Sequence, residues 1–302
     1  MISRRTLGEA RRPGVPPHPQ HPLPTALIPR RAVPLAASLA IWAAHDPRPA
    51  VAQGAPLPAQ PVRYLLSTLA ADARALWVNP AGLARQAEAS LGADISVDRQ
   101  PGGTHLSQYG ATLASRSFAL GWTHGREPGG PSTNSYAIGL GLGDAAFSAG
   151  ASRRWVRGPT RASFWDLAGS TAGRWLRVSL VARNLDSPMP GDTAWAPSLV
   201  PGLGATLLGR RVDAGLEWEV ATRGWRSRTW RIGGTVALWG GVALAVRADL
   251  ARDLGVSGLA VAVHLEAPTA RATAFTLLPK GGGLEGFGMA GALVARGPYP
   301  RR

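Results

Sequence analysis

The chain has 302 residues, with 38 glycines, 26 prolines, no cysteine and a formal net charge of +15. The absence of cysteine excludes disulfide frameworks, thiolate zinc sites and cysteine nucleophiles. The basic residues are all arginine except Lys280, and they are scattered rather than gathered in a stripe, so we expect no nucleic-acid binding.

Residues 1–52 are predicted to be a leader outside the folded domain. Residues 1–31 are rich in Pro and Arg and have no periodicity, which is typical of disorder. The apolar run at 32–44 is too short for a membrane-spanning helix, which needs roughly 20 apolar residues. Its basic flank and the Ala-Val-Ala run that ends at Ala52 indicate a secretory signal peptide cleaved after Ala52. The competing interpretation is a buried core helix, but the Pro-rich flanks give it nothing to pack against.

The stretch Ala73 to Ala84 (ARALWVNPAGLA) predicts a short helical turn that ends at Asn79-Pro80. A residue before proline is pushed out of the helical region, and Asn-Pro followed by Ala-Gly is typical of a sharp corner. The apolar face of this turn must be buried against the following chain, and it consists of Leu76, Trp77 and Leu83.

The same stretch, taken from Asp72 to Ala84, resembles the N-terminal signature of the FadL and PorV-like outer-membrane β-barrels. A second segment, Trp175 to Asp186 (WLRVSLVARNLD), resembles a mid-barrel strand of PorV-like proteins that ends in an Arg-Asn-Leu turn. The resemblance implies a barrel of fourteen strands, with residues 53–87 as a segment at or inside its periplasmic mouth. The residues that it assigns to a plug or mouth motif are Trp77, Asn79, Pro80 and Gly82.

From residue 88 onward the dominant period is two, which predicts strands with unlike faces. We count about thirteen such segments, separated by Gly and Pro turn signals as in an up-and-down antiparallel sheet. The clearest apolar ladders run over 91–97, 118–122, 136–142, 176–180, 212–220, 230–238, 242–250, 259–265 and 287–293.

Two architectures fit this pattern and bury opposite faces. A soluble sandwich or barrel turns the apolar face inward, whereas a transmembrane barrel turns it to lipid and lines its lumen with the polar face. Segments such as 211–223 are long enough for the roughly 9–11 residues that a tilted strand needs to cross a membrane. Aromatic residues recur near the strand ends, as at membrane interfaces: Trp122, Tyr136, Trp155, Trp175, Trp225 and Trp239.

Charged residues on the non-apolar faces also favour a wet lumen over a dry core. The candidate lumen charges are Arg177, Arg183, Asp213, Glu217, Glu219, Arg231, Arg247 and Asp249. The carboxylates 213, 217 and 219 share one strand face. They are expected either to form interstrand ion pairs that fill or gate the lumen, or to build a conduction or ligand site.

No catalytic constellation is found. The histidines beyond the leader, His105, His124 and His264, lack metal-ligand spacing, and no motif has the spacing of a nucleotide site or a nucleophile elbow. We therefore expect no enzyme activity, no metal and no cofactor.

The sequence thus predicts an all-β protein, an up-and-down transmembrane β-barrel over residues 88–296 with a short tail at 297–302. Fourteen strands are favoured, and twelve remain open because bacterial barrels of one chain have even strand numbers. The protein would be exported through its signal peptide and contact outer-membrane lipid. It would pass small hydrophobic molecules or form the barrel of a secretion or envelope assembly with secretion-system proteins. The alternative is a soluble, secreted β-sandwich or barrel that acts as a binding module.

Overall fold

The computed structural model describes residues 62–85, 89–100, 103–126, 131–144, 146–159, 161–187, 196–279 and 286–295. The predicted leader, its signal peptide and the tail at 297–302 lie outside these residues. Within the described ranges, no helix is long and apolar enough to cross a membrane.

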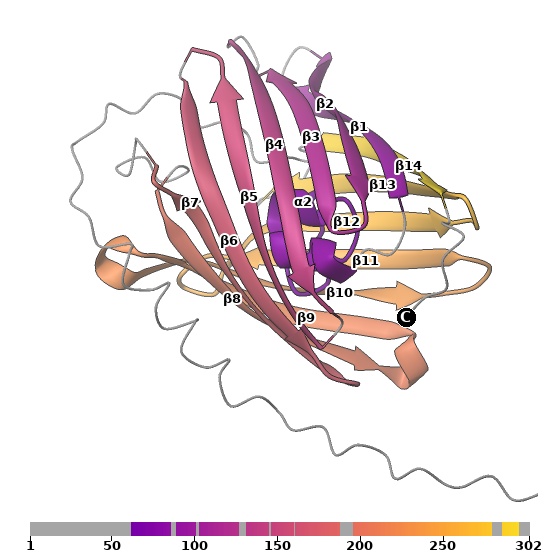
Figure 1. Cartoon of the computed structure of the whole chain (residues 1–302). Coiled ribbons are helices and arrows are strands. Elements are labelled where there is room, and N and C mark those ends of the chain that lie inside the picture. The colour runs from indigo at the N-terminus through magenta and orange to yellow at the C-terminus, as the bar shows by residue number, and fades with distance from the viewer. Residues whose placement is uncertain are drawn as a thin grey trace, which may run out of the picture.

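Fourteen antiparallel strands form one closed barrel, in which each strand pairs with its neighbours in chain order (Figure 1). The prediction of a fourteen-stranded up-and-down barrel is confirmed, and the twelve-stranded and sandwich alternatives are wrong. The strands are β1 (Ala89–Gln100), β2 (Gly103–Ser115), β3 (Phe118–Arg126), β4 (Ser132–Gly143), β5 (Phe147–Arg157), β6 (Ala162–Ala172), β7 (Leu176–Leu185), β8 (Ser198–Leu207), β9 (Val212–Ala221), β10 (Arg226–Ala237), β11 (Val242–Leu250), β12 (Val256–Glu266), β13 (Ala270–Pro279) and β14 (Gly286–Ala295).

The barrel closes through the pairing of its first and last strands. β1 and β14 run antiparallel, from Ala89 opposite Ala295 to Asp98 opposite Gly286. This ladder leaves no open sheet edge, so the backbone of the wall is hydrogen-bonded from strand to strand around the ring.

Five strands, β2, β5, β6, β8 and β13, are absent from the apolar ladders of the sequence. They carry small or polar residues on both faces, which weakens the contrast on which a period-two reading depends. β8 also contains Pro201, which lacks a donor for a ladder bond. The β8–β9 ladder is interrupted there, between the pairs Leu199–Val220 and Gly202–Glu217, so the missing donor is tolerated.

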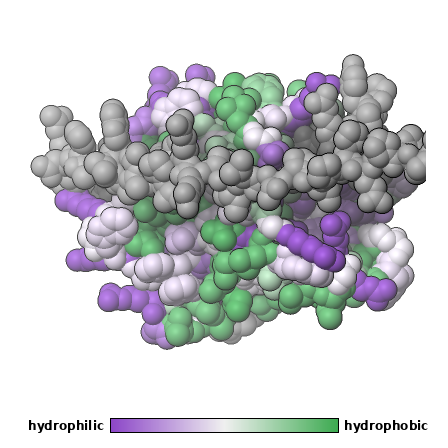
Figure 2. Space-filling model, turned by 60° about the horizontal axis from the view of Figure 1, so that its bottom comes forward, coloured by the Kyte–Doolittle hydropathy of each residue, from purple (hydrophilic) through white to green (hydrophobic). Residues whose placement is uncertain are grey.

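The two faces of the wall differ in character along the same strands. A row of directly paired residues on β7 to β10 points outward and is 40 to 51% exposed, and it consists of Val178, Leu203, Leu216 and Ile232. The adjacent row points inward and is polar or small, and it consists of Ser179, Gly202, Glu217, Arg231 and Asp249. Figure 2 shows hydrophobic side chains gathered over the middle and lower part of one face, with hydrophilic ones toward its left and right margins.

Residues 62–85, hereafter the lumen segment, lie inside the barrel and include α2 (Ala75–Val78) and η2 (Pro80–Arg85) (Figure 1). α2 ends at Asn79, whose extended backbone (φ −160°, ψ 91°) is the conformation expected before proline. The chain then continues as the 3₁₀ helix η2 rather than as a corner alone. Leu76 and Leu83 are fully buried, and Trp77 is half-buried.

Candidate functional site

The wall beneath the helical part of the lumen segment is lined by glycines. A Cβ atom added at Gly141 would lie 2.3 Å from the backbone nitrogen of Ala84, and one at Gly150 would lie 2.3 Å from the carbonyl carbon of Pro80. Real Cβ contacts do not reach such distances, so these positions admit the segment only because they lack a side chain. Two further inward glycines meet side chains of α2, namely Gly121 and Gly139.

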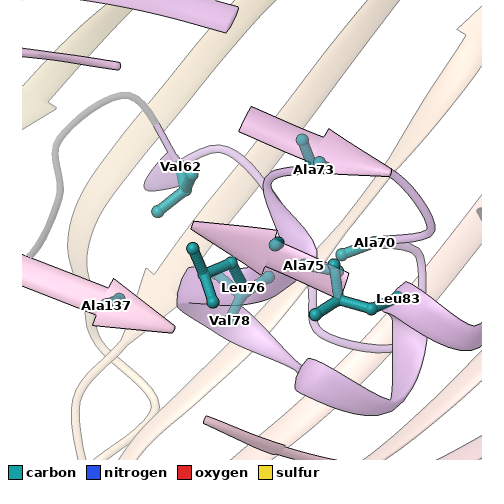
Figure 3. Close-up of a cluster of buried hydrophobic side chains, with 10 residues drawn as sticks. Val62, Ala70, Ala73, Ala75, Leu76, Val78, Leu83 and Ala137 are labelled. Atoms are coloured by element: carbon teal, nitrogen blue, oxygen red, sulfur yellow. The ribbon is translucent and has the colours of Figure 1, made fainter. Parts of the chain in front are cut away.

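The apolar side chains of the lumen segment form a cluster with this wall. Figure 3 shows Leu76, Val78 and Leu83 in one group with Ala70 and Ala75, beside Ala137 of β4. The wall contributes only alanines to this cluster: Ala114, Ala119 and Ala137. Small wall residues and larger segment residues therefore fill the space together.

The first part of the segment contacts the opposite side of the barrel. The Tyr64 ring lies 5.3 Å from the His264 ring and 5.8 Å from the Phe275 ring, between centroids. Thr68 packs where Gly202 and Gly204 of β8 leave room. The segment therefore reaches across the lumen from β3–β5 to β8 and β12–β13.

Glu217 fixes the middle of the segment. Its carboxylate accepts hydrogen bonds from the backbone N–H groups of Ser67 and Thr68, and the residue is 2% exposed. A hydrogen bond to a charged group contributes about 1.5–3 kcal/mol, and burial removes competing water. Glu217 is therefore an anchor for the segment rather than a free lumenal charge.

Two arginines hold carbonyl groups of the same segment. Arg247 donates to the Leu65 carbonyl at 2.9 Å, while Asp249 orients its guanidinium through bonds of 2.7 and 2.8 Å. Arg183 donates to the Val78 carbonyl at 3.1 Å. The wall thus binds both the donors and the acceptors of the segment backbone.

Asn79 links the two halves of the lumen segment. Its side-chain amide donates to the Ser67 carbonyl at 2.9 Å, and its side-chain oxygen accepts from the Ala81 N–H at 3.1 Å. A Cβ at Gly82 would lie 2.2 Å from the Ala70 oxygen, so this position requires glycine. These contacts give the Asn-Pro-Ala-Gly run a structural role in folding the segment back on itself.

The other motif residues also contact the wall. Trp77 donates its indole N–H to the Thr112 hydroxyl at 3.3 Å. Pro80 begins η2 and packs against Gly150.

The remaining predicted lumen charges pair along the wall. Arg177 lies 3.2 Å from Asp213, and the Thr206 hydroxyl bridges them. Arg231 donates to Glu219, which also lies 3.6 Å from Arg228. The structure therefore brings these residues together as interstrand pairs, whereas Glu217 and Arg247 turn to the lumen segment.

Some residues of this site were not singled out from the sequence. They are Tyr64, Ser67 and Thr68 of the segment, the Asp72–Arg74 pair, and the inward network of Arg154, Asp166 and Asn184. The sequence feature that could have predicted this contact surface is the position of the wall glycines. They alternate along their strands so that they share the inward face. Within the described ranges, no group of three or more His, Asp or Glu residues could hold a metal ion.

Asp72 and Arg74 close a tight turn in the lumen segment. The Asp72 carboxylate accepts from the Arg74 backbone N–H at 2.9 Å and from its guanidinium, which also donates to the Tyr64 hydroxyl. Burial alone would raise the pKa of Asp72, but the charge and hydrogen bonds of Arg74 outweigh it and hold that pKa below its usual value.

No family model matches the chain, and no curated protein matches it either. Solved structures that are similar to it include the Acinetobacter baumannii outer membrane protein Omp33, with 7% identity and a TM-score of 0.47 over 68% of this chain and 97% of that chain. The KdgM porin has 10% identity and a TM-score of 0.40 over 68% and 98%. A variant of Rh. blastica porin has 7% identity and a TM-score of 0.39 over 69% and 99%. These values are too low to decide an activity or a substrate.

Gly150→Ala is expected to loosen the lumen segment. The new methyl group would overlap the Pro80 backbone, and overpacking of this kind costs about 1–3 kcal/mol. Tryptic cleavage after Arg74, inside the lumen, should become about tenfold faster if the opened form is the one cleaved. Gly169→Ala is the control, because a Cβ there meets nothing within 4 Å. Equal cleavage rates in the two variants would contradict this packing.

Asp72→Asn is expected to flatten the acid dependence of stability. Because the folded pKa is lowered, the charged carboxylate stabilises the fold above the unfolded pKa of about 4, and this contribution is lost as the pH falls through the folded value. The variant should lose about 1 kcal/mol at neutral pH and less in acid. The measurement is the unfolding temperature between neutral and acidic pH, with Asp253→Asn in an exposed loop as control. Parallel profiles for wild type and Asp72→Asn would refute the assignment.

Proposed function

We propose that this protein is a non-enzymatic, integral outer-membrane β-barrel. The observation that carries the proposal is the sidedness of the closed wall. Large apolar side chains such as Leu203 and Ile232 are exposed on its outside, while Glu217 and Arg247 are buried inside. A soluble protein rarely exposes so much apolar surface to water, whereas in a membrane the lipid chains cover this surface and keep it out of water.

The inside of the barrel argues against the soluble alternative. A soluble barrel would place its apolar ladders inward, but here the inward row carries Glu217, Arg231 and Asp249.

Export through a signal peptide and the outer membrane as destination remain part of the proposal. Closed barrels of this type satisfy the backbone without water, which is the requirement for crossing a lipid bilayer.

Within this class we propose passage of small hydrophobic molecules, as the resemblance to FadL-like proteins suggests. The lumen segment presents apolar side chains, including Leu76, Val78 and Leu83, against a wall of glycine and alanine. If the segment moves aside, an apolar molecule can occupy the space that these side chains fill. The segment would then act as the closing element of the pathway.

A second candidate is a closed barrel that serves a secretion or envelope assembly, as in PorV-like proteins. The observation that favours it is that several strands of the wall bind the lumen segment. Glu217, Arg183 and Arg247 bind its backbone from three different strands. A barrel built in this way can be a permanently closed scaffold for secretion-system proteins.

Fractionation of expressing cells and gel migration of the membrane fraction, with and without boiling, test the membrane assignment. A heat-shifted band in the outer membrane supports it, and a soluble band without a shift rejects it. Leu203→Arg should cost about 2–4 kcal/mol of folding stability in lipid vesicles, because it places a charge on the middle of the lipid-facing wall. Leu254→Arg, on an exposed loop residue, is the control and should be near neutral.

Conductance across a planar bilayer separates the two candidates. Glu217→Ala leaves two buried N–H groups of the segment without their acceptor, a cost of about 1–3 kcal/mol, so open events should become about tenfold more frequent. Glu266→Ala, at an exposed ion pair, should leave the open frequency unchanged. If Glu217→Ala shows no open events in the bilayer, the result would favour the closed scaffold. Unchanged permeability in both Glu217→Gln and Glu219→Gln would exclude a conduction site at these charges.

A further inference from the structure

The outer wall carries three arginines, at the end of β3, near the middle of β5 and at the end of β5. Arg157 lies opposite Asn134, and Arg153 lies opposite Ile138, which is exposed on the outer wall. Directly opposite residues share a face of the sheet, so both guanidiniums belong to the outside of the barrel. Arg126 of β3, opposite Ser132, has the same outward parity. We call Arg126, Arg153 and Arg157 the outer patch.

An aromatic row crosses this patch on the same face, between Arg153 and Arg157. Trp122, Tyr136 and Trp155 are direct cross-strand neighbours, and Tyr136 and Trp155 are each 40% exposed. The Arg157 guanidinium lies 5.7 Å from the centre of the Tyr136 ring, and that of Arg153 lies 5.0 Å from the Trp165 ring. Aromatic side chains in such a row mark the level of lipid headgroups, where arginines reach toward water.

Among the described residues, the outer patch has more positive than negative charge. Asp186, which follows β7, lies 2.9 Å from Arg153 and also accepts the Trp165 backbone N–H. No other carboxylate lies on the outward face of the described parts of β3 to β6, since Asp166 points inward to Arg154. Arg157 is exposed and forms no ion pair with any residue in the described ranges.

We infer that the outer patch binds the phosphate of an anionic lipid headgroup. The inference rests on the proposed function, because only an inserted barrel presents this wall to lipid. Guanidinium groups bind phosphate oxygens through paired, charge-assisted hydrogen bonds. The aromatic row and the apolar wall beyond it suit the acyl chains of the same molecule, which free phosphate lacks. Charge and apolar surface therefore match one amphipathic ligand.

Native mass spectrometry of the full chain in detergent tests this site. The probe is short-chain phosphatidic acid, and phosphatidylcholine with the same acyl chains is the headgroup control. Wild type should bind phosphatidic acid about tenfold more tightly than phosphatidylcholine, since one charge-assisted contact is worth about that factor. The double variant Arg153→Gln/Arg157→Gln should lose this preference. The matched control Arg210→Gln/Arg211→Gln removes the same charge from an exposed turn at the opposite end of the barrel and should keep it.

The possible outcomes separate this inference from the proposed function. A wild-type chain without a heat-shifted band overturns membrane insertion and the lipid site together. A heat-shifted chain whose Arg153→Gln/Arg157→Gln variant binds phosphatidic acid as tightly as wild type overturns the lipid site alone. Full displacement of phosphatidic acid by equimolar inorganic phosphate would assign the patch to free phosphate and overturn the lipid assignment. Loss of binding in the patch variant alone, without such displacement, supports it.

Discussion

The ladder between β1 and β14 is the constraint on which the rest of the structure depends. Once the ring is closed, the inside or outside position of every side chain follows from its parity along the strand. A slip of one residue in this ladder would turn Leu91 and Ile95 into the lumen and Asp94 outward. The apolar outer wall and the polar inner wall are therefore two results of one register.

The inner wall also has to leave room for residues 62–85. Glycines on β3 to β5 and on β8 and β9 remove side chains where the segment approaches, and charged residues elsewhere bind its backbone. The two devices are complementary, because close approach brings polar backbone groups out of water and these groups then need partners. Glu217, Arg183 and Arg247 supply those partners. The lumen is thus a packed interior built by the strands and the segment together.

Much of the fold could be predicted from the sequence because its signal is local. Alternation over β9 to β12 is visible in the residues themselves, and so is the stop at Asn79-Pro80. The partners of the charges could not be predicted, because they depend on the register between strands and on a segment far away in the chain. Glu217 and Ser67 are 150 residues apart, and parity shows only that Glu217 faces inward. The role of the wall glycines could not be predicted for the same reason. A glycine is required at these positions only because the lumen segment packs against them.

The covalent attachment of the lumen segment has a mechanical consequence. Its last residue, Arg85, is only a few residues before the start of β1 at Ala89. The segment contacts the wall through side chains and through its own backbone, and it does not form a further strand of the sheet. Withdrawal of the segment would therefore break side-chain bonds and packing but no hydrogen bond of the strand ladders. The strand ladders and the bonds to the segment are thus two separate sets of interactions, and Glu217, Arg183 and Arg247 belong to the second set. The hydrogen-bonded wall can therefore persist while its interior changes between filled and open.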